Sequence, residues 1–165
     1  MNLYNSTTRT ITRNKIGIRG LTVWVTAILL GCGGGNDPEP VAPTEREKVT
    51  QMLTSGEGTW TPQPSSGVTV DGVDVTDDLF PGFSITFQEK TFTTTGTSPV
   101  WLRQDTWFFK NQSSTVIVRG QDSKEITITE ISDTQLKLTL EWTKTTTEGG
   151  RQGSLKGKHE FILTK

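Results

Sequence analysis

The sequence predicts an all-β protein, an eight-stranded antiparallel up-and-down barrel with a short helix in front of it. From Gly58 onward, threonine-rich segments alternate polar and apolar residues, and turn residues recur about every 8–12 positions. The connections are short, which requires antiparallel rather than parallel pairing. Eight such strands can close into a barrel without exposed edges, and a β-sandwich is the alternative.

Residues 44–56, TEREKVTQMLTSG, predict the helix. Thr44 can cap its first turn, with Glu47 three positions later completing a capping box. Val49, Met52 and Leu53 fall on one face at helical spacing, and Gly56 can end the helix.

The strands follow from alternation of apolar and polar residues. In FSITF, for example, Phe83, Ile85 and Phe87 share one face of an extended segment. Asp71-Gly72 predicts a tight turn in an additional small hairpin. The eight barrel strands are expected near residues 58–62, 83–88, 91–95, 104–110, 115–119, 125–131, 134–144 and 154–164.

The segment TWFFK breaks this alternation. Trp107 and Phe109 lie on one side of the strand, and Phe108 lies on the other. A strand that is apolar on both faces is expected to be covered on both faces. The 44–56 helix or the small hairpin is therefore expected to cover Phe108 from outside, and an exposed aromatic is the alternative.

The first 31 residues have the order of a secretory signal peptide. They hold four basic residues and no acidic residue, followed by the apolar run LTVWVTAILL at 21–30. The run has about half of the ~20 residues that a membrane-spanning helix needs. Residues 1–31 are therefore expected to be removed rather than to remain as an anchor.

Leu29, Leu30 and Gly31 precede Cys32, the chain's single cysteine. This stretch resembles the lipobox of bacterial lipoproteins, although Leu30 is bulkier than the usual small residue. The resemblance implies cleavage after Gly31, a diacylglycerol thioether on Cys32 and a further acyl chain, such as palmitate, on the new amino terminus. The alternative is a secreted protein with an unused cysteine.

The lipobox divides the chain into three parts. After the signal peptide come the lipidated cysteine and a flexible Gly/Pro tether at 32–43, and then the barrel domain at 44–165. A lipid-anchored location in the cell envelope follows, and the outer membrane is expected, on either its periplasmic face or the cell surface. The mature chain has 13 basic and 18 acidic residues, net −5, which disfavours nucleic acid and anionic lipid headgroups as partners.

Several stretches support a family resemblance. Gly58-Thr59-Trp60 matches the Gly-x-Trp of the first lipocalin strand, and VTVDGVDVT, PGFSITF, TWFF, SDTQLKLTLEW and GGRQGSLKGKHEFIL resemble small lipocalin-like lipoproteins of Gram-negative bacteria. The resemblance implies the barrel fold but no function, because that group is largely uncharacterised. Two features of true lipocalins are missing: a Thr-Asp-Tyr motif, and an arginine late in the last strand that would stack on Trp60.

Aromatic side chains are the strongest candidates for a binding site. They can line an apolar pocket in an eight-stranded barrel, or they can fill it. Phe92 and Trp101 belong to the same group of interior aromatics. The candidate pocket residues are Trp60, Phe83, Phe87, Trp107, Trp142, His159 and Phe161.

Metal and catalytic chemistry have weaker support. One histidine and an acylated cysteine are too few for a zinc site, and His159 is expected to face the core. Asp71, Asp74, Asp77 and Asp78 form the densest acidic cluster and are weak calcium candidates, with turn chemistry as the alternative.

The sequence therefore predicts a non-catalytic module without a cofactor, which binds a small apolar ligand in or at the barrel mouth. The alternative is a structural or accessory envelope lipoprotein whose filled barrel binds a protein or glycan through its rim. An enzyme that uses His159 or loop carboxylates is a third hypothesis.

Overall fold

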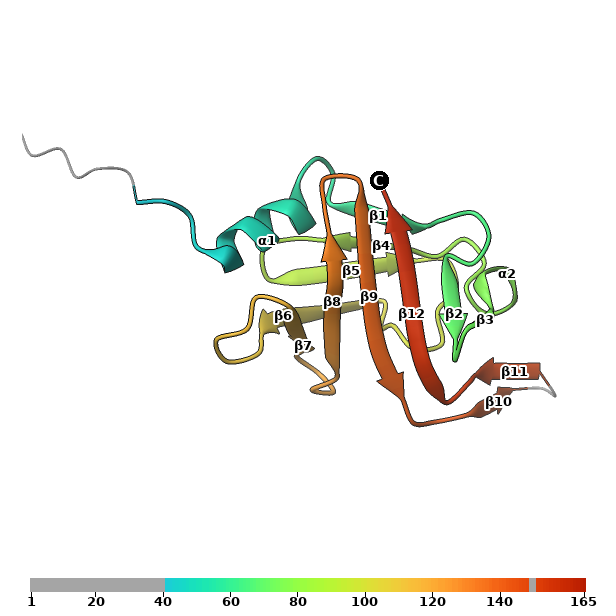
Figure 1. Ribbon diagram of the computed structural model, residues 1–165. Helices are drawn as coiled ribbons and strands as arrows, with labels where there is room; N and C mark the ends of the chain where they lie inside the picture. The colour runs from blue at the N-terminus through green and yellow to red at the C-terminus, as the bar shows by residue number, and fades with distance from the viewer. Residues whose placement is uncertain (1–40, 149–150) are drawn as a thin grey trace, which may run out of the picture. The chain divides into compact units, whose positions relative to one another are not determined.

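A computed structural model describes residues 41–148 and 151–165 and shows a closed barrel (Figure 1). The barrel is built from β1 (Thr59–Pro62), β4 (Ser84–Phe87), β5 (Thr91–Thr95), β6 (Gln104–Phe109), β7 (Val116–Arg119), β8 (Glu125–Ile131), β9 (Gln135–Trp142) and β12 (Gly157–Thr164). Each strand pairs antiparallel with the next, and β1 also pairs with β12. The predicted eight-stranded barrel is confirmed, and the β-sandwich alternative is not formed.

The small hairpin extends the barrel wall. It consists of β2 (Val68–Val70) and β3 (Val73–Asp74), and β2 pairs with the first half of β12 while β1 pairs with its second half. Asp71 and Gly72 both have positive φ angles, 49° and 83°, as a type I′ turn requires. The predicted Asp71-Gly72 turn is therefore confirmed.

The helix α1 (Glu45–Thr54) covers one end of the barrel, which we call the α1 end. Its capping box is formed: the Glu47 amide donates to Thr44 Oγ1 at 3.3 Å, and the Thr44 amide donates to Glu47 Oε2 at 2.6 Å. The hydrogen bond from the Thr44 amide, followed by the interaction with the Thr44 side chain, holds the pKa of the Glu47 carboxyl below its usual value. Val49 and Leu53 are buried, so α1 contributes its apolar face to the barrel core.

The Gly-x-Trp motif has a steric basis at this end. Gly58 has φ +65°, and a Cβ there would lie 2.3 Å from the carbonyl oxygen of Phe87. Two residues later Trp60 is fully buried, and its Nε1 donates to the Leu53 carbonyl at 3.0 Å. The Gly-x-Trp motif thus packs β1 closely against β4 and bonds it to α1.

Lys165 stacks on Trp60, the contact that an arginine late in the last strand makes in true lipocalins. Its ammonium lies 4.3 Å from the ring centroid of Trp60 and donates to the Met52 carbonyl at 2.9 Å and to Ser55 Oγ. The last residue of the chain therefore ties β12 to the end of α1. Burial lowers the pKa of Lys165, and Asp133 partly opposes this shift.

Two short elements differ from the sequence prediction. A four-residue helix, α2 (Thr76–Leu79), follows β3, and a two-stranded sheet, β10 (Thr146–Glu148) with β11 (Arg151–Ser154), separates β9 from β12. The last barrel strand begins at Gly157 rather than at 154, because Ser154 belongs to β11 and pairs with β10. Gly157 has φ +140°, and a Cβ there would lie 2.4 Å from Asp71 Oδ2. Asp71 also accepts a hydrogen bond from the Lys158 amide at 2.9 Å, which docks the hairpin tip on β12.

The expected outer cover of Phe108 is incomplete. Its side chain is 54% exposed, while Trp107 beside it is buried. The prediction that α1 or the β2–β3 hairpin covers this face is therefore wrong, and the exposed-aromatic alternative holds.

Candidate functional site

The barrel interior holds six of the seven predicted pocket residues. Phe83 and Phe87 come from the start and end of the β4 segment, and the other four are Trp60, Trp107, His159 and Phe161, each at most 5% exposed. Trp142 is the exception. It lies at the end of β9, partly buried, with the Lys124 ammonium 5.5 Å from its ring centroid.

The interior rings pack against one another rather than around a space. Phe87 meets Trp107 edge to face at 6.0 Å between centroids, and it also meets Phe92 at 6.3 Å. Phe92 meets Trp101 at 5.4 Å, and Trp101 meets Phe161 at 5.8 Å. These contacts, within the range for favourable aromatic pairs, form a continuous path along the inside of the barrel.

The end of the barrel opposite α1, here called the rim, is plugged by two loops. Phe80, which the sequence analysis did not single out, follows α2 and meets Phe161 edge to face at 5.3 Å. Trp101 comes from the loop between β5 and β6 and is 5% exposed. Val75, Leu79 and Val100 are buried beside them. The rim is therefore closed by the protein's own side chains.

Arg119 holds the Trp101 loop in place. Its side chain is 1% exposed, its Nη1 donates to the Val100 carbonyl at 2.5 Å, and its guanidinium carbon lies 5.7 Å from the Trp101 ring centroid. The guanidinium also pairs with Asp122, donating from Nε to Oδ1 at 3.0 Å. Burial acts to raise the pKa of Asp122, but the hydrogen bond from Arg119 and that from the Lys124 amide lower it overall. The alternation in VIVR, which places Arg119 on the same face as Ile117, is the sequence signal for this inward arginine.

His159 faces the core, as predicted. Its ring is fully buried, stacks on Phe161 at 6.3 Å, and has Nδ1 at 3.3 Å from the Gly157 carbonyl oxygen. Nε2 is buried without a hydrogen-bond partner among the described residues. Burial lowers the pKa of His159, so the ring is uncharged at neutral pH. Within the described chain its hydrogen bonds reach neither a serine hydroxyl nor a carboxylate, the contacts that a triad requires.

The weak calcium candidates take part in local structure. Asp74 accepts hydrogen bonds from the Thr76 hydroxyl at 2.7 Å, from the Thr76 amide at 3.0 Å and from the Ser66 amide at 2.8 Å. These bonds, that of the Thr76 hydroxyl most of all, lower the pKa of Asp74. Asp71 is bonded to Lys158, as described above. Asp77 and Asp78 are exposed on α2. In residues 41–148 and 151–165, no three His, Cys, Asp or Glu side chains come together as a metal site would need.

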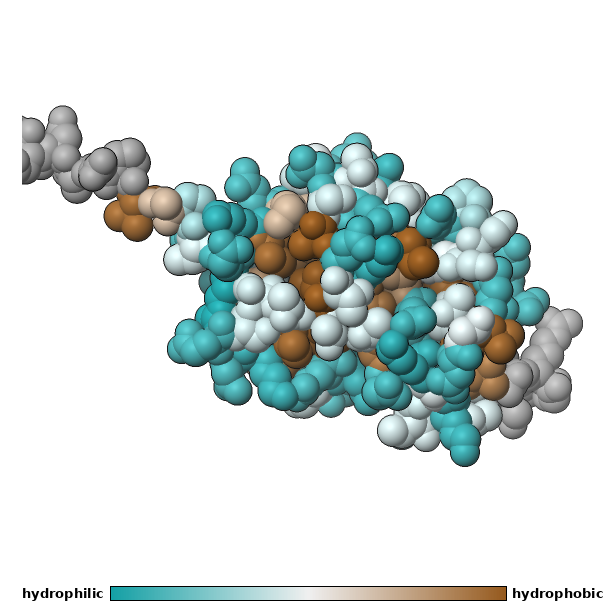
Figure 2. Space-filling view, in the orientation of Figure 1, coloured by the Kyte–Doolittle hydropathy of each residue, from teal (hydrophilic) through white to brown (hydrophobic). Residues whose placement is uncertain are grey.

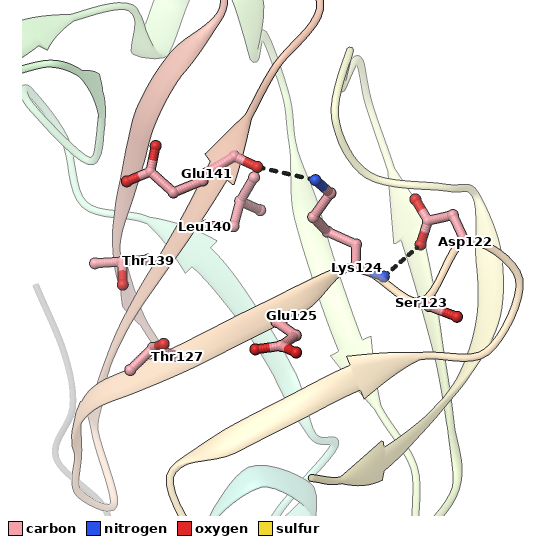
Figure 3. A pocket seen from close by; sticks show the side chains of 8 residues that line it. All are labelled: Asp122, Ser123, Lys124, Glu125, Thr127, Thr139, Leu140 and Glu141. Carbon is pink, nitrogen blue, oxygen red and sulfur yellow. Dashed lines mark hydrogen bonds between the residues drawn. The ribbon is translucent and has the colours of Figure 1, made fainter.

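An open polar cleft lies at the rim between β8 and β9 (Figure 3). The two strands pair from Thr127–Thr139 onward, although β8 starts at Glu125 and β9 continues to Trp142. They therefore separate toward the rim, and the Lys124 ammonium spans the separation to the Glu141 carbonyl at 3.0 Å. The cleft has a volume of about 470 Å3 and is lined by Asp122, Ser123, Lys124, Glu125, Thr127, Thr139, Leu140 and Glu141.

The fold places the protein in a structural class. The part of the chain that the structure describes is a closed eight-stranded antiparallel barrel, consistent with a lipocalin-like fold. No family model matches the sequence, and neither the curated proteins nor the solved structures contain a significant match. None of the helices described here is long and apolar enough to cross a membrane. The predicted signal peptide, Cys32 and residues 33–40 of the tether lie outside the described residues.

Proposed function

We propose that this chain is a lipocalin-like lipoprotein of the cell envelope that is anchored through Cys32 and works by contacts on its outer surface, without catalysis. Of the two functions that the sequence favours, rim binding with a filled barrel has the better geometric support. The observation that carries this choice is Trp101, whose ring lies within the barrel in contact with Phe92 and Phe161.

A ligand inside the barrel would have to displace these rings. Pockets for small molecules usually measure about 300–1,000 Å3. The path of contacting rings from Trp107 to Phe161 occupies the corresponding part of this barrel. Because Arg119 fixes the loop that carries Trp101, opening the rim would also break the hydrogen bond from Arg119 to Val100.

The cleft between β8 and β9 supplies the polar surface for a rim partner. It combines the carboxylates of Glu125 and Glu141, the Lys124 ammonium and threonine hydroxyls. Such groups can bond sugar hydroxyls or peptide groups. The ring of Trp142 lies beside the cleft under Lys124, and its Nε1 has no partner in the described chain. A glycan or protein surface fits this combination better than an apolar molecule does.

The filled interior is tested with an apolar fluorescent probe, N-phenylnaphthylamine, titrated against the mature protein and a Trp101→Ala variant. We expect no saturable binding to the wild type and binding to the variant, because the substitution opens an apolar cavity. Trp101→Phe, which keeps a ring at this place, is the control. Stoichiometric binding of the probe to the wild type, competed by lipids extracted from the host envelope, would overturn the filled-barrel proposal.

The rim contact is tested in the native host with a photoreactive amino acid. Placed at Ser123 in the cleft, the group is expected to crosslink to an envelope protein or glycan. The matched position is Thr134, in the β8–β9 turn at the α1 end. Equal crosslinking at the two positions, or none at Ser123, counts against a rim site.

A further inference from the structure

A second surface feature lies at the α1 end, in a groove between α1 and β6. Glu47, Thr50, Gln51 and Thr54 line it from the helix, and Glu89, Lys90, Thr106, Trp107, Phe108 and Phe109 line it from the barrel. The groove has a volume of about 670 Å3. Its aromatic floor distinguishes it from the polar cleft at the rim.

The residue beside Phe108 on the neighbouring strand is also apolar, although it is buried. Phe108 pairs with Val118 of β7, and paired residues point to the same side of a sheet. Trp107 and its partner Arg119 point into the barrel, so Phe108 and Val118 lie on the outer surface. Val118 is 8% exposed. Phe108 thus packs beside a buried valine on the outer face of the barrel and is itself the exposed apolar side chain of this pair.

One exposed apolar side chain precedes the helix and another lines the groove beside it. Within the described residues, the exposed large apolar side chains are Val41, Val73 and Phe108, at 92%, 66% and 54%. Val41 lies three residues before the helix cap Thr44, and Phe108 lines the groove beside the helix. Figure 2 shows further apolar side chains between α1 and the adjacent end of β8, surrounded by polar residues. Val73 in the β2–β3 hairpin lies toward the rim and serves as a reference position.

The groove is lined by two carboxylates, Glu47 and Glu89, and by one ammonium, Lys90. Glu45 pairs with Lys48 at 2.7 Å, and Lys110 pairs with Glu125 at 2.7 Å. The carboxylate of Glu47 is engaged in the capping box. Lys90, at the edge of the groove, makes no ion pair in the described chain. The face therefore offers an apolar centre and an ammonium that makes no ion pair, with the carboxylates of Glu47 and Glu89 beside them. This small net negative charge disfavours anionic lipid and favours a zwitterionic surface.

We propose that this groove face, centred on Phe108 with Lys90 at its edge, docks on the zwitterionic lipid surface that holds the Cys32 anchor. This docking rests on the lipidation in the proposed function. The tether from Cys32 to Thr44 reaches at most ~40 Å, so the face is held at high effective concentration near the membrane. A weak apolar contact is then sufficient, with the phenylalanine in the interface and the lysine extending toward headgroups. Docking at the α1 end leaves the rim cleft free for a partner.

The experiment measures depth in a bilayer on the acylated protein. Mature lipoprotein carrying Phe108→Cys or Val73→Cys is labelled with a nitroxide and inserted into vesicles of phosphatidylethanolamine and phosphatidylcholine. Cys32 is the chain's single cysteine, so its acylation leaves the introduced thiol as the labelling site. We expect a several-fold higher ratio of oxygen to nickel-complex accessibility at 108 than at 73.

A measurement on unlabelled protein guards against a label that disturbs the fold. Vesicles with brominated acyl chains are expected to quench Trp107 beneath the groove. Phe108→Gln should reduce this quenching, whereas Val73→Gln should leave it unchanged. Equal effects of the two substitutions would overturn the docking.

The outcomes separate the two proposals. An unmodified Cys32 in the intact mass removes the anchor of the proposed function and the docking with it. An acylated Cys32 with equal accessibility ratios at 108 and 73 removes the docking alone. Short nitroxide–nitroxide distances between two copies labelled at 108 would assign the groove to a second copy and also overturn docking on lipid.

Discussion

Replacing Lys165 by alanine is expected to destabilise the barrel, although its side chain lies at the protein surface. Here the ammonium lies 4.3 Å from the Trp60 ring centroid and donates to the Met52 carbonyl at 2.9 Å. The substitution tests whether this short contact joins β12 to α1.

The expected loss follows from these contacts. A cation–π contact contributes about 0.5–2 kcal/mol, depending on its exposure. Hydrogen bonds from a charged donor add about 1 kcal/mol net at a partly exposed site. We therefore expect Lys165→Ala to lower the free energy of unfolding by about 1.5–3 kcal/mol, whereas Lys165→Arg retains most of it.

Urea unfolding followed by tryptophan fluorescence measures this loss. Lys158→Ala is the matched control, since Lys158 forms an exposed ion pair with Glu160 at 2.7 Å and such pairs contribute about 0–1 kcal/mol. A Lys165→Ala variant as stable as the Lys158→Ala variant would refute the reasoning. The contacts of Lys165 with Trp60 and Met52 would then add nothing to stability.

Three further predictions concern the glycine motif, the buried histidine and the helix cap. Gly58→Ala should lower the free energy of unfolding by at least about 1 kcal/mol more than Gly56→Ala does, as measured by thermal or urea unfolding. Both positions have φ near +65°, but only at 58 does a Cβ meet a backbone oxygen. Equal losses of stability in the two variants would contradict the steric argument. The pKa of His159 in the folded protein lies below its unfolded value of about 6.5, so the unfolded state binds a proton more readily. The free energy of unfolding therefore falls as the pH drops from about 6.5 toward the folded pKa, by up to ~1.4 kcal/mol per pH unit. His159→Leu should remove that component between pH 6.5 and 5, and an unchanged pH profile of urea midpoints would contradict it. Thr44→Ala should cost about 1 kcal/mol by removing the cap of α1, and no change in the midpoint would show that the cap adds nothing.

The strand pattern could be predicted because it depends on local alternation. Residues 91–95 and 125–131 are strands within the predicted limits. Leu136, Leu138 and Leu140 face the interior as expected. Trp142 shares their periodicity but only partly enters the core, because β9 separates from β8 beyond Thr139. Alternation gives the face of a residue and does not reveal where two strands part.

The contacts that close the two ends could not be predicted from local pattern. Lys165 meets Trp60 across 105 positions, since its ring contact depends on the closure of β12 against β1. Phe80 enters the interior because the segment after the β2–β3 hairpin turns back through α2. Its neighbours in the sequence, Leu79 and Pro81, carry no periodic signal for that turn. The sequence therefore indicated which of these aromatic side chains face inward, Trp142 excepted, and did not indicate which residues close the rim.

The packing of Trp101 also sets a quantitative limit on the ligand-binding alternative. Removing a buried tryptophan from a core costs about 3–5 kcal/mol, and a ligand that displaced Trp101 without equivalent burial elsewhere would give up a similar amount. Since each 1.4 kcal/mol is tenfold in affinity, such a ligand would bind roughly a hundred to a few thousand times more weakly than to a preformed cavity. A contact on the outer surface carries no such cost, because the rim cleft and the α1–β6 groove are already open. For a barrel with this interior, surface contacts are therefore the energetically favoured way to bind a partner.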